Sequence, residues 1–231
     1  MLKVYHYQFS ASSRFIRLIS SEYGLEVSLV REKFWERRPD FLRMNPAGTV
    51  PVVCENEGLV ICGALPFMEH LYETRNCNTA KHLFMPQDPS GRAEVRRLVE
   101  WFLIKCYNEA LSYLVYERLL KLEMSNSCVN KSPDTTVLRI ARDNTRHHLE
   151  YLAWLVSSRN WLANTKWISF ADFAAASVIS VLDYLGEIDW EYDESLRQWY
   201  QKVKSRPSFR AILMDKTVLL QPPATYVDLD F

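Results

Sequence analysis

The apolar positions of this 231-residue chain follow two different periods, which divide it into two parts. In the first part, short runs rich in Val, Ile and Tyr are separated by turn residues, which predicts strands interrupted by helices. The serines from Ser10 to Ser13 supply N-cap candidates for the first helix, and Gly24 ends it. The expected strands are 2–7, 27–30, 52–54 and 59–62, and a closing helix is expected at 65–72. The order β-α-β followed by β-β-α predicts a four-stranded sheet with helices packed against it.

After residue 89 the strand signals disappear, and apolar residues recur at helical spacing. A helix of roughly thirty residues is expected from Ser90 to about Leu122. Its apolar stripe is broader than one packing partner needs, so contact with another subunit and burial under neighbouring helices are equal alternatives. Further helices are expected at 137–157 and at 196–204, the latter stopped by Pro207. The predicted domains are 1–80 (α/β), a linker at 81–89, an all-helical domain at 90–220 and a tail at 221–231.

Ser169 and Asp172 form the S-x-x-D pattern of a capping box, directly before a run of apolar and small residues. The pattern predicts a helix at the buried centre of the second domain, with a structural role for the Asp172 carboxylate.

The stretch 41–53, FLRMNPAGTVPVV, is the most informative part of the chain. Asn45 to Gly48 predict a tight turn, and residues 35–43 lead into it without a predicted element of their own. Pro51 stands at the start of a strand, where its missing N–H is tolerated. A proline so placed often follows a cis bond, which exposes the backbone of Val50 to an extended ligand. The alternative is an ordinary loop-to-strand transition.

Charge and cysteine content narrow the function classes. Basic and acidic residues both number 28, so no net field attracts nucleic acid or an anionic membrane. The most apolar stretch, 173–182, is about half the length that crosses a bilayer, and we expect a cytoplasmic protein. Five cysteines without a CxxC pair suit a reducing compartment. Adjacent His147 and His148 point in different directions on a helix, so we expect no metal site.

Four motifs in this order resemble the glutathione S-transferase superfamily: SRFIRLISSEYGL, NPAGTVP, SFADFAAASV and WYQKVKSRPSF. The resemblance covers nearly the whole chain and implies a thioredoxin-like N-terminal domain with a helical C-terminal bundle. It further implies that Val50, held by Pro51, contacts the cysteinyl part of glutathione through its backbone. Ser10 or Ser13, with Ser12 as a further candidate, would stabilise the glutathione thiolate. Helix capping is the alternative role for at least one of these serines.

The chain departs from the superfamily where an acidic residue and a serine usually hold the γ-glutamyl group. Gly63 and Ala64 stand there instead, and neither side chain can pair with an ammonium or a carboxylate. Each lost charge-assisted hydrogen bond is worth about 1.5 to 3 kcal/mol. The backbone N–H groups of the helix start still attract a carboxylate, so we expect weakened glutathione binding and no required cofactor.

Three other segments resemble a narrower alphaproteobacterial branch of FtsZ-localised, transferase-like cell-division proteins: KFWERRP, LDYLGEIDW and the ending PPATYVDLDF. Members of that branch bind filaments of the division GTPase FtsZ as dimers. The resemblance therefore implies a homodimeric binding protein at the division site, with FtsZ polymers as partner. The partner-binding residues we expect are Trp35, if its ring is exposed, and Tyr226, Asp228, Leu229, Asp230 and Phe231.

Three alternatives stay open. The tail could instead fold back and cover the helical domain. The chain could also be a working transferase that joins glutathione to small electrophiles, with Ser10 or Ser13 as the catalytic residue. A thiol oxidoreductase of the same fold is a remote third, because it needs a cysteine after the first strand and position 13 is Ser.

Overall fold

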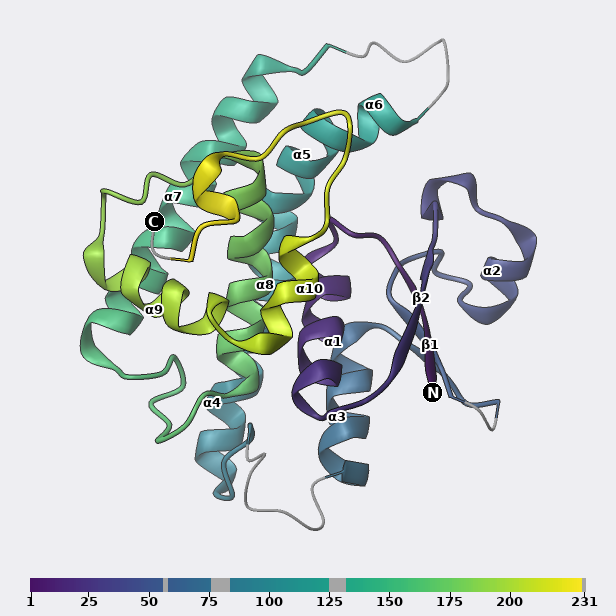
Figure 1. The fold of residues 1–231 in the computed structure, drawn as a ribbon, viewed down its shortest axis with the longest axis horizontal. Helices are drawn as coiled ribbons and strands as arrows, with labels where there is room; N and C mark the ends of the chain where they lie inside the picture. The colour runs from purple at the N-terminus through teal and green to yellow at the C-terminus, as the bar shows by residue number, and fades with distance from the viewer. Residues whose placement is uncertain (56–57, 76–83, 125–131, 230–231) are drawn as a thin grey trace.

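The computed structural model describes residues 1–55, 58–75, 84–124 and 132–229 of the chain. Its N-terminal lobe is a four-stranded sheet in the order β2-β1-β3-β4, in which β1 is parallel to β2 and antiparallel to β3. Helices α1 and α3 lie between this sheet and the helical lobe (Figure 1). The elements are β1 (Leu2–His6), α1 (Ala11–Glu22), β2 (Val27–Arg31), β3 (Val52–Cys54), β4 (Val60–Cys62) and α3 (Ala64–Arg75). The predicted β-α-β, β-β-α order is thereby confirmed.

The segment between β2 and β3 contains two short helices, η1 (Phe34–Glu36) and α2 (Pro39–Met44). The sequence pattern did not predict these helices, because a helix of six residues is too short to show a helical period. Pro39 occupies the first turn of α2, where its missing N–H costs nothing. The turn after α2 is closed by the Asn45 side chain, which donates to the carbonyl of Thr49 over 2.8 Å. The Val50–Pro51 bond that follows is cis.

The C-terminal lobe is helical throughout its described elements. Its first helix runs without a break through 89–123, as expected, but two of its five segments have π-helical hydrogen bonding. The elements are α4 (Pro89–Glu100), η2 (Trp101–Leu111), α5 (Ser112–Val115), η3 (Tyr116–Leu120), α6 (Lys121–Glu123), α7 (Thr135–Ser158), α8 (Phe170–Leu185), α9 (Glu194–Lys204), η4 (Pro207–Phe209), α10 (Arg210–Leu213) and η5 (Ala224–Tyr226).

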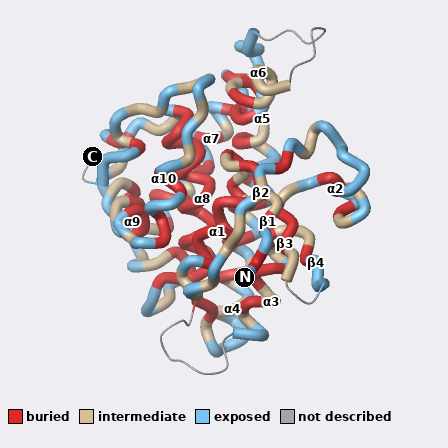
Figure 2. The backbone as a smooth tube through the Cα atoms, turned by 45° about the vertical axis from the view of Figure 1, so that its right-hand side comes forward, coloured by how far each residue is buried: buried red, intermediate tan, exposed pale blue. Residues whose placement is uncertain are grey.

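Helix α8 is the buried centre of this lobe, as the capping pattern predicted. All of its residues are buried, and it appears as a continuous buried stretch in Figure 2. The Asp172 carboxylate accepts from the backbone N–H of Ser169 over 2.9 Å and of Leu162 over 3.0 Å. It also accepts from the Ser169 hydroxyl and from Nε1 of Trp199. Asp172 therefore joins the start of α8 to the preceding loop and to α9.

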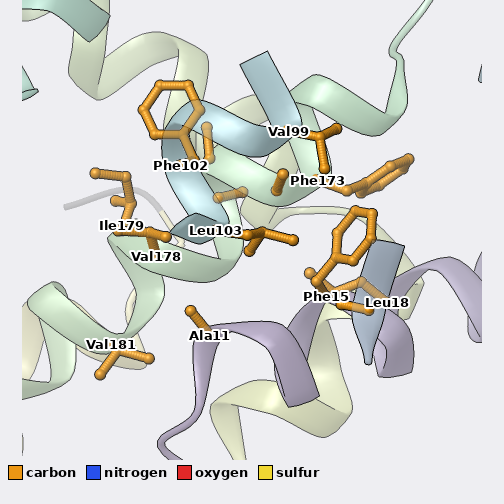
Figure 3. Close-up of a cluster of buried hydrophobic side chains, with 14 of the residues drawn as sticks. Ala11, Phe15, Leu18, Val99, Phe102, Leu103, Phe173, Val178, Ile179 and Val181 are labelled. Atoms are coloured by element: carbon orange, nitrogen blue, oxygen red, sulfur yellow. The ribbon is translucent and has the colours of Figure 1, made fainter. Parts of the chain in front are cut away.

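Helix α1 connects the two lobes because both of its sides are buried. Its residues Ala11, Phe15 and Leu18 share one apolar cluster with side chains of α4, η2 and α8 (Figure 3). Arg17 makes a bidentate pair with Asp215, at 2.7 and 3.1 Å, and so joins α1 to the segment after α10. The domains are therefore packed on one continuous core.

The C-terminal segment folds back over the helical lobe as far as it is described. Tyr226 is fully buried and its hydroxyl donates to the carbonyl of Ile212 over 2.9 Å. The ammonium of Lys204 donates to the carbonyls of Thr225 and Asp228, each over 2.6 Å. Over residues 222–229 the tail therefore covers the helical domain, which was the alternative to a free tail. Asp230 and Phe231 lie outside the described residues.

Several smaller expectations concern single residues. His147 is exposed, whereas the neighbouring His148 is buried and lies 3.1 Å from a carboxylate oxygen of Glu109, so the pair does point in different directions.

Cys54 and Cys62 are half-buried and Cys106 is buried, all as free thiols. Cys77 and Cys128 lie outside the described residues. Within the described ranges, no helix has the length and apolar character to cross a membrane, and no group of His, Cys, Asp and Glu could hold a metal ion.

The contacts of Asp172 predict that Asp172→Ala strongly destabilises the protein. The substitution leaves N–H groups of Ser169, Leu162 and Trp199 buried without their acceptor. We expect the free energy of unfolding, measured by urea titration, to fall by about 3 kcal/mol or more. Asp172→Asn is the matched control, because its amide keeps one oxygen acceptor and should lose less. An unchanged urea midpoint in Asp172→Ala would contradict the role assigned to this carboxylate.

Burial of His6 predicts a pH dependence of stability. Burial, reinforced by the charge of Arg17, lowers the pKa of His6 from 6.5 to about 4. As pH falls from 6.5 towards 4, the unfolded chain gains a proton at His6 that the folded chain does not, so stability is lost. The loss amounts to about 3 kcal/mol by pH 4. In His6→Gln the fall in unfolding free energy over this range should be smaller than in the wild type by that amount. Identical pH profiles would refute the assignment.

Candidate functional site

A cavity of about 310 Å³ lies between the two lobes. Its wall on the sheet side comes from the residues after β1, the residues before β3, η1, and the starts of α1 and α3. Its other wall comes from η2, α5 and η3. The lining residues are Tyr7, Phe9, Ser10, Ser12, Phe34, Thr49, Val50, Pro51, Gly63, Ala64, Leu65, Pro66, Leu103, Ile104, Tyr107, Asn108, Val115 and Leu120. Every residue in this lining is uncharged. The cavity therefore offers shape and apolar surface without a formal charge.

The residues predicted to form a glutathione pocket meet in this cavity, with one exception. Ser10, Ser12, Val50, Pro51, Gly63 and Ala64 all line it. Ser13 is fully buried outside the lining, where its hydroxyl accepts from the backbone N–H of Tyr7 over 3.4 Å. The assignment of Ser13 as a catalytic residue is therefore not supported by its position, because the first turn of α1 points its side chain into the protein.

Ser10 caps a helix and also lines the cavity. It is the N-cap of α1, and its hydroxyl oxygen accepts from the backbone N–H of Ser13 over 3.2 Å. It also lines the cavity, together with the half-buried Ser12. A hydroxyl engaged in capping can still donate its proton to a ligand, so Ser10 and Ser12 are the serines that a bound molecule would meet.

Tyr7 is a cavity residue that the sequence analysis missed. It lies directly after β1, and its hydroxyl donates to a Glu123 oxygen over 3.4 Å. The other Glu123 oxygen accepts from Arg31 over 2.9 Å, so Glu123 is held from both sides. Burial and the neighbouring Glu123 charge raise the pKa of Tyr7 far above its ordinary value. Tyr7 therefore remains a neutral phenol. The sequence signal was available, since Tyr7 is the last residue of the predicted first strand and directly precedes the segment that carries the serines.

The start of α3 forms one corner of the cavity. Gly63 adopts φ +96°, a conformation that favours glycine, and Ala64 opens the helix behind it. The carbonyl of Pro51 accepts from the N–H of Gly63 over 2.9 Å, which ties this corner to the cis peptide. Gly63 and Ala64 both line the cavity, and neither has an acidic or hydroxyl side chain, as the sequence predicted.

The residues expected to bind a partner lie partly in the interior and partly at the surface. Trp35 is half-buried, with its ring edge-on to Tyr7 and Phe34 at centroid distances of 5.7 and 5.2 Å, so it is not an exposed anchor. Tyr226 is buried and cannot contact a partner while the tail is folded back. Asp228 and Leu229 are exposed at the surface of the helical lobe. Of the residues predicted to bind a partner, Asp228 and Leu229 are therefore exposed, and Asp230 and Phe231 lie outside the described residues.

Comparison with known proteins assigns the fold. Residues 4–79 match the family model "Glutathione S-transferase, N-terminal domain". FtsZ-localized protein A from Caulobacter vibrioides is 38% identical over 99% of this chain and 97% of its own. The crystal structure of a glutathione S-transferase from Sinorhizobium meliloti covers all of both chains with 47% identity and a TM-score of 0.96. The structure of FzlA from C. crescentus covers 100% of this chain and 99% of its own with 38% identity and a TM-score of 0.90.

The chain belongs to the glutathione S-transferase superfamily. Within that superfamily it is similar over its whole length to FtsZ-localized protein A, in sequence and in fold. The predicted fold class, a thioredoxin-like domain followed by a helical bundle, is confirmed.

Proposed function

We propose that this protein is a binding protein of bacterial cell division that associates with FtsZ polymers as a homodimer, with weak or no glutathione-conjugating activity. The observation that carries the proposal is the 38% identity to FtsZ-localized protein A over 99% of the chain. The uncharged cavity supports it, because glutathione carries two carboxylates and an ammonium group that find no charged side chain there.

The partner surface of this proposal is the end of the folded-back tail. Lys204 holds the backbone of Thr225 and Asp228 from below, so Asp228 and Leu229 are presented on a fixed segment rather than on a free chain. Fixing the segment before binding reduces the ordering entropy that association would cost. An exposed carboxylate beside an exposed leucine offers a partner one polar and one apolar contact.

Dimerisation is supported by the first helix of the C-terminal lobe. Tyr113 and Tyr116 are exposed on this helix beyond what the neighbouring helices cover, and neither lines the cavity. The broad apolar stripe of the sequence therefore continues on the surface, where a second copy can bury it. Light scattering of the free protein measures the expected doubling of mass.

The tail surface predicts the effect of a double substitution, Asp228→Asn with Leu229→Ala. It removes the exposed charge and apolar group but keeps the buried Tyr226 and the Lys204 contacts to the backbone. We expect co-sedimentation with FtsZ polymers to weaken by about tenfold or more in apparent affinity. Val218→Ala is the matched control, because Val218 is 96% exposed in the loop before the tail. This substitution should leave the apparent affinity for FtsZ polymers unchanged. If the double variant sediments like the control, the tail is not the contact.

A second candidate function is glutathione conjugation. Ser10, Ser12 and Val50 do line one cavity, and the Sinorhizobium meliloti structure that shares 47% identity is named a glutathione S-transferase. In this reading the hydroxyl of Ser10 or Ser12 donates to the thiolate, and the N–H groups at the start of α3 attract the γ-glutamyl carboxylate.

Calorimetric titration with glutathione separates the two candidates. The absence of charged lining residues predicts no measurable heat at concentrations of several millimolar. Replacing Ala64 by Ser restores one missing hydroxyl at the start of α3 and should bring detectable, weak binding. Binding to the wild-type protein in the high micromolar range or tighter would instead favour the transferase.

A further inference from the structure

Two aromatic contacts connect the wall of the cavity to the C-terminal tail. Phe9 lines the cavity from the turn between β1 and α1, and its ring centre lies 4.5 Å from that of Tyr184 in α8. The ring of Tyr184 is also edge-on to the ring of Tyr226, the buried anchor of the tail, at 5.0 Å between centres. All three rings are buried. A single intervening side chain therefore joins the cavity wall to the tail.

The guanidinium of Arg14 is a second link between the same two residues. Its central carbon lies 5.4 Å from the ring centre of Phe9 and 5.9 Å from the ring centre of Tyr226. A cation is attracted to an aromatic ring, and the attraction is stronger when both groups are out of water. Arg14 and both rings are buried, so this link is of the stronger kind.

Polar contacts attach the chain that leads into the tail to the same region. The hydroxyl of Tyr184 accepts from the N–H of Thr217 over 3.0 Å and donates to the carbonyl of Leu220 over 2.7 Å. Gln8, next to Phe9, donates to the carbonyl of Lys216 over 3.1 Å. Buried groups packed in this way do not move independently, because a shift of one ring leaves a void beside the next.

We propose that Phe9 is a positioning residue for the tail. Its ring holds Tyr184 and Arg14 against Tyr226, so that the wall of the cavity and the docked tail form one cooperative unit. Displacing Phe9 therefore shifts the tail towards an undocked state through these two residues. The coupling itself does not depend on FtsZ. Its consequence for the surface at Asp228 rests on the proposed function.

Hydrogen exchange of the free protein tests the coupling without any partner. The N–H groups of Tyr226 and Val227 donate to the carbonyls of Pro223 and Ala224, so their exchange reports the opening of η5. Phe9→Leu removes the ring but keeps a buried apolar side chain. We expect it to raise the exchange rate of these two amides by about tenfold.

Phe41→Leu is the matched control. Phe41 is a buried phenylalanine of the same lobe, and its ring lies against Tyr5, at 6.1 Å between centres. This variant should leave the exchange rate of the tail amides within about twofold of the wild type. Urea titration of both variants shows whether their global stabilities match, so that faster exchange confined to the tail of Phe9→Leu reports a local effect.

The coupling must also act in the opposite direction, because it is reciprocal. Tyr226→Leu should speed exchange at the N–H of Ser10, which donates to the carbonyl of Tyr7 over 3.0 Å beside the cavity. Adding Phe9→Leu to Tyr226→Leu should change the exchange rate of the tail by less than about twofold, since both substitutions interrupt the same contacts. Effects that multiply independently would overturn the proposal.

Co-sedimentation with FtsZ polymers separates this coupling from the proposed function. Phe9→Leu should bind the polymers more weakly than Phe41→Leu, because its tail is docked for less of the time. Faster tail exchange with unchanged co-sedimentation would support the coupling and contradict the tail as the partner surface. Equal tail exchange in Phe9→Leu and Phe41→Leu would overturn the coupling, whatever the co-sedimentation shows.

Discussion

Burial of the Arg14 guanidinium at the junction of the lobes is the constraint on which the rest of the arrangement depends. Its side chain is fully buried, donates to the carbonyl of Gln8 over 2.8 Å and to the hydroxyl of Ser180 over 2.9 Å, and lies 3.8 Å from a carboxylate oxygen of Asp215. It also stacks on the ring of Tyr226 at 5.9 Å. Because a buried charge is costly without its partners, each of these groups is held in place.

The partners of Arg14 belong to the cavity and to the folded-back tail, the two regions considered for function. Gln8 lies in the turn that carries Ser10 and Ser12 into the cavity, and Tyr226 is the anchor of the folded-back tail. The same residue therefore fixes one wall of the cavity and the base of the tail surface. Both regions are thereby anchored to one buried charge. The residues at the surface of each region are neutral in the cavity and are Asp228 and Leu229 on the tail.

Most of the fold could be predicted from the sequence, because strong local signals agreed with the tertiary packing. The serine and aspartate of the capping box marked the buried helix α8, and the strand runs marked the sheet. The short helix α2 could not be predicted, since six residues carry no period. The burial of Tyr226 could not be predicted either, because a tail motif of alternating acidic and apolar residues is compatible with both a free and a docked segment.

The candidate site was predicted in part. The superfamily resemblance brought Ser10, Val50, Pro51 and the corner at Gly63 together correctly, because these positions follow fixed turns of the thioredoxin-like domain. Ser13 lies outside the cavity lining, since the choice among neighbouring serines depends on which way each faces in the first turn of α1. The partners of Tyr7, at Glu123 and Arg31, required the tertiary structure because they lie far apart in the chain.

Hydrogen exchange of the full-length protein, with and without FtsZ polymers, tests most directly whether this transferase fold now serves filament binding. The account predicts slower exchange in the tail around residues 222–229 when polymers are present, and no change around 49–66 on adding glutathione. Unchanged exchange in the tail together with glutathione-dependent protection at 49–66 would contradict it.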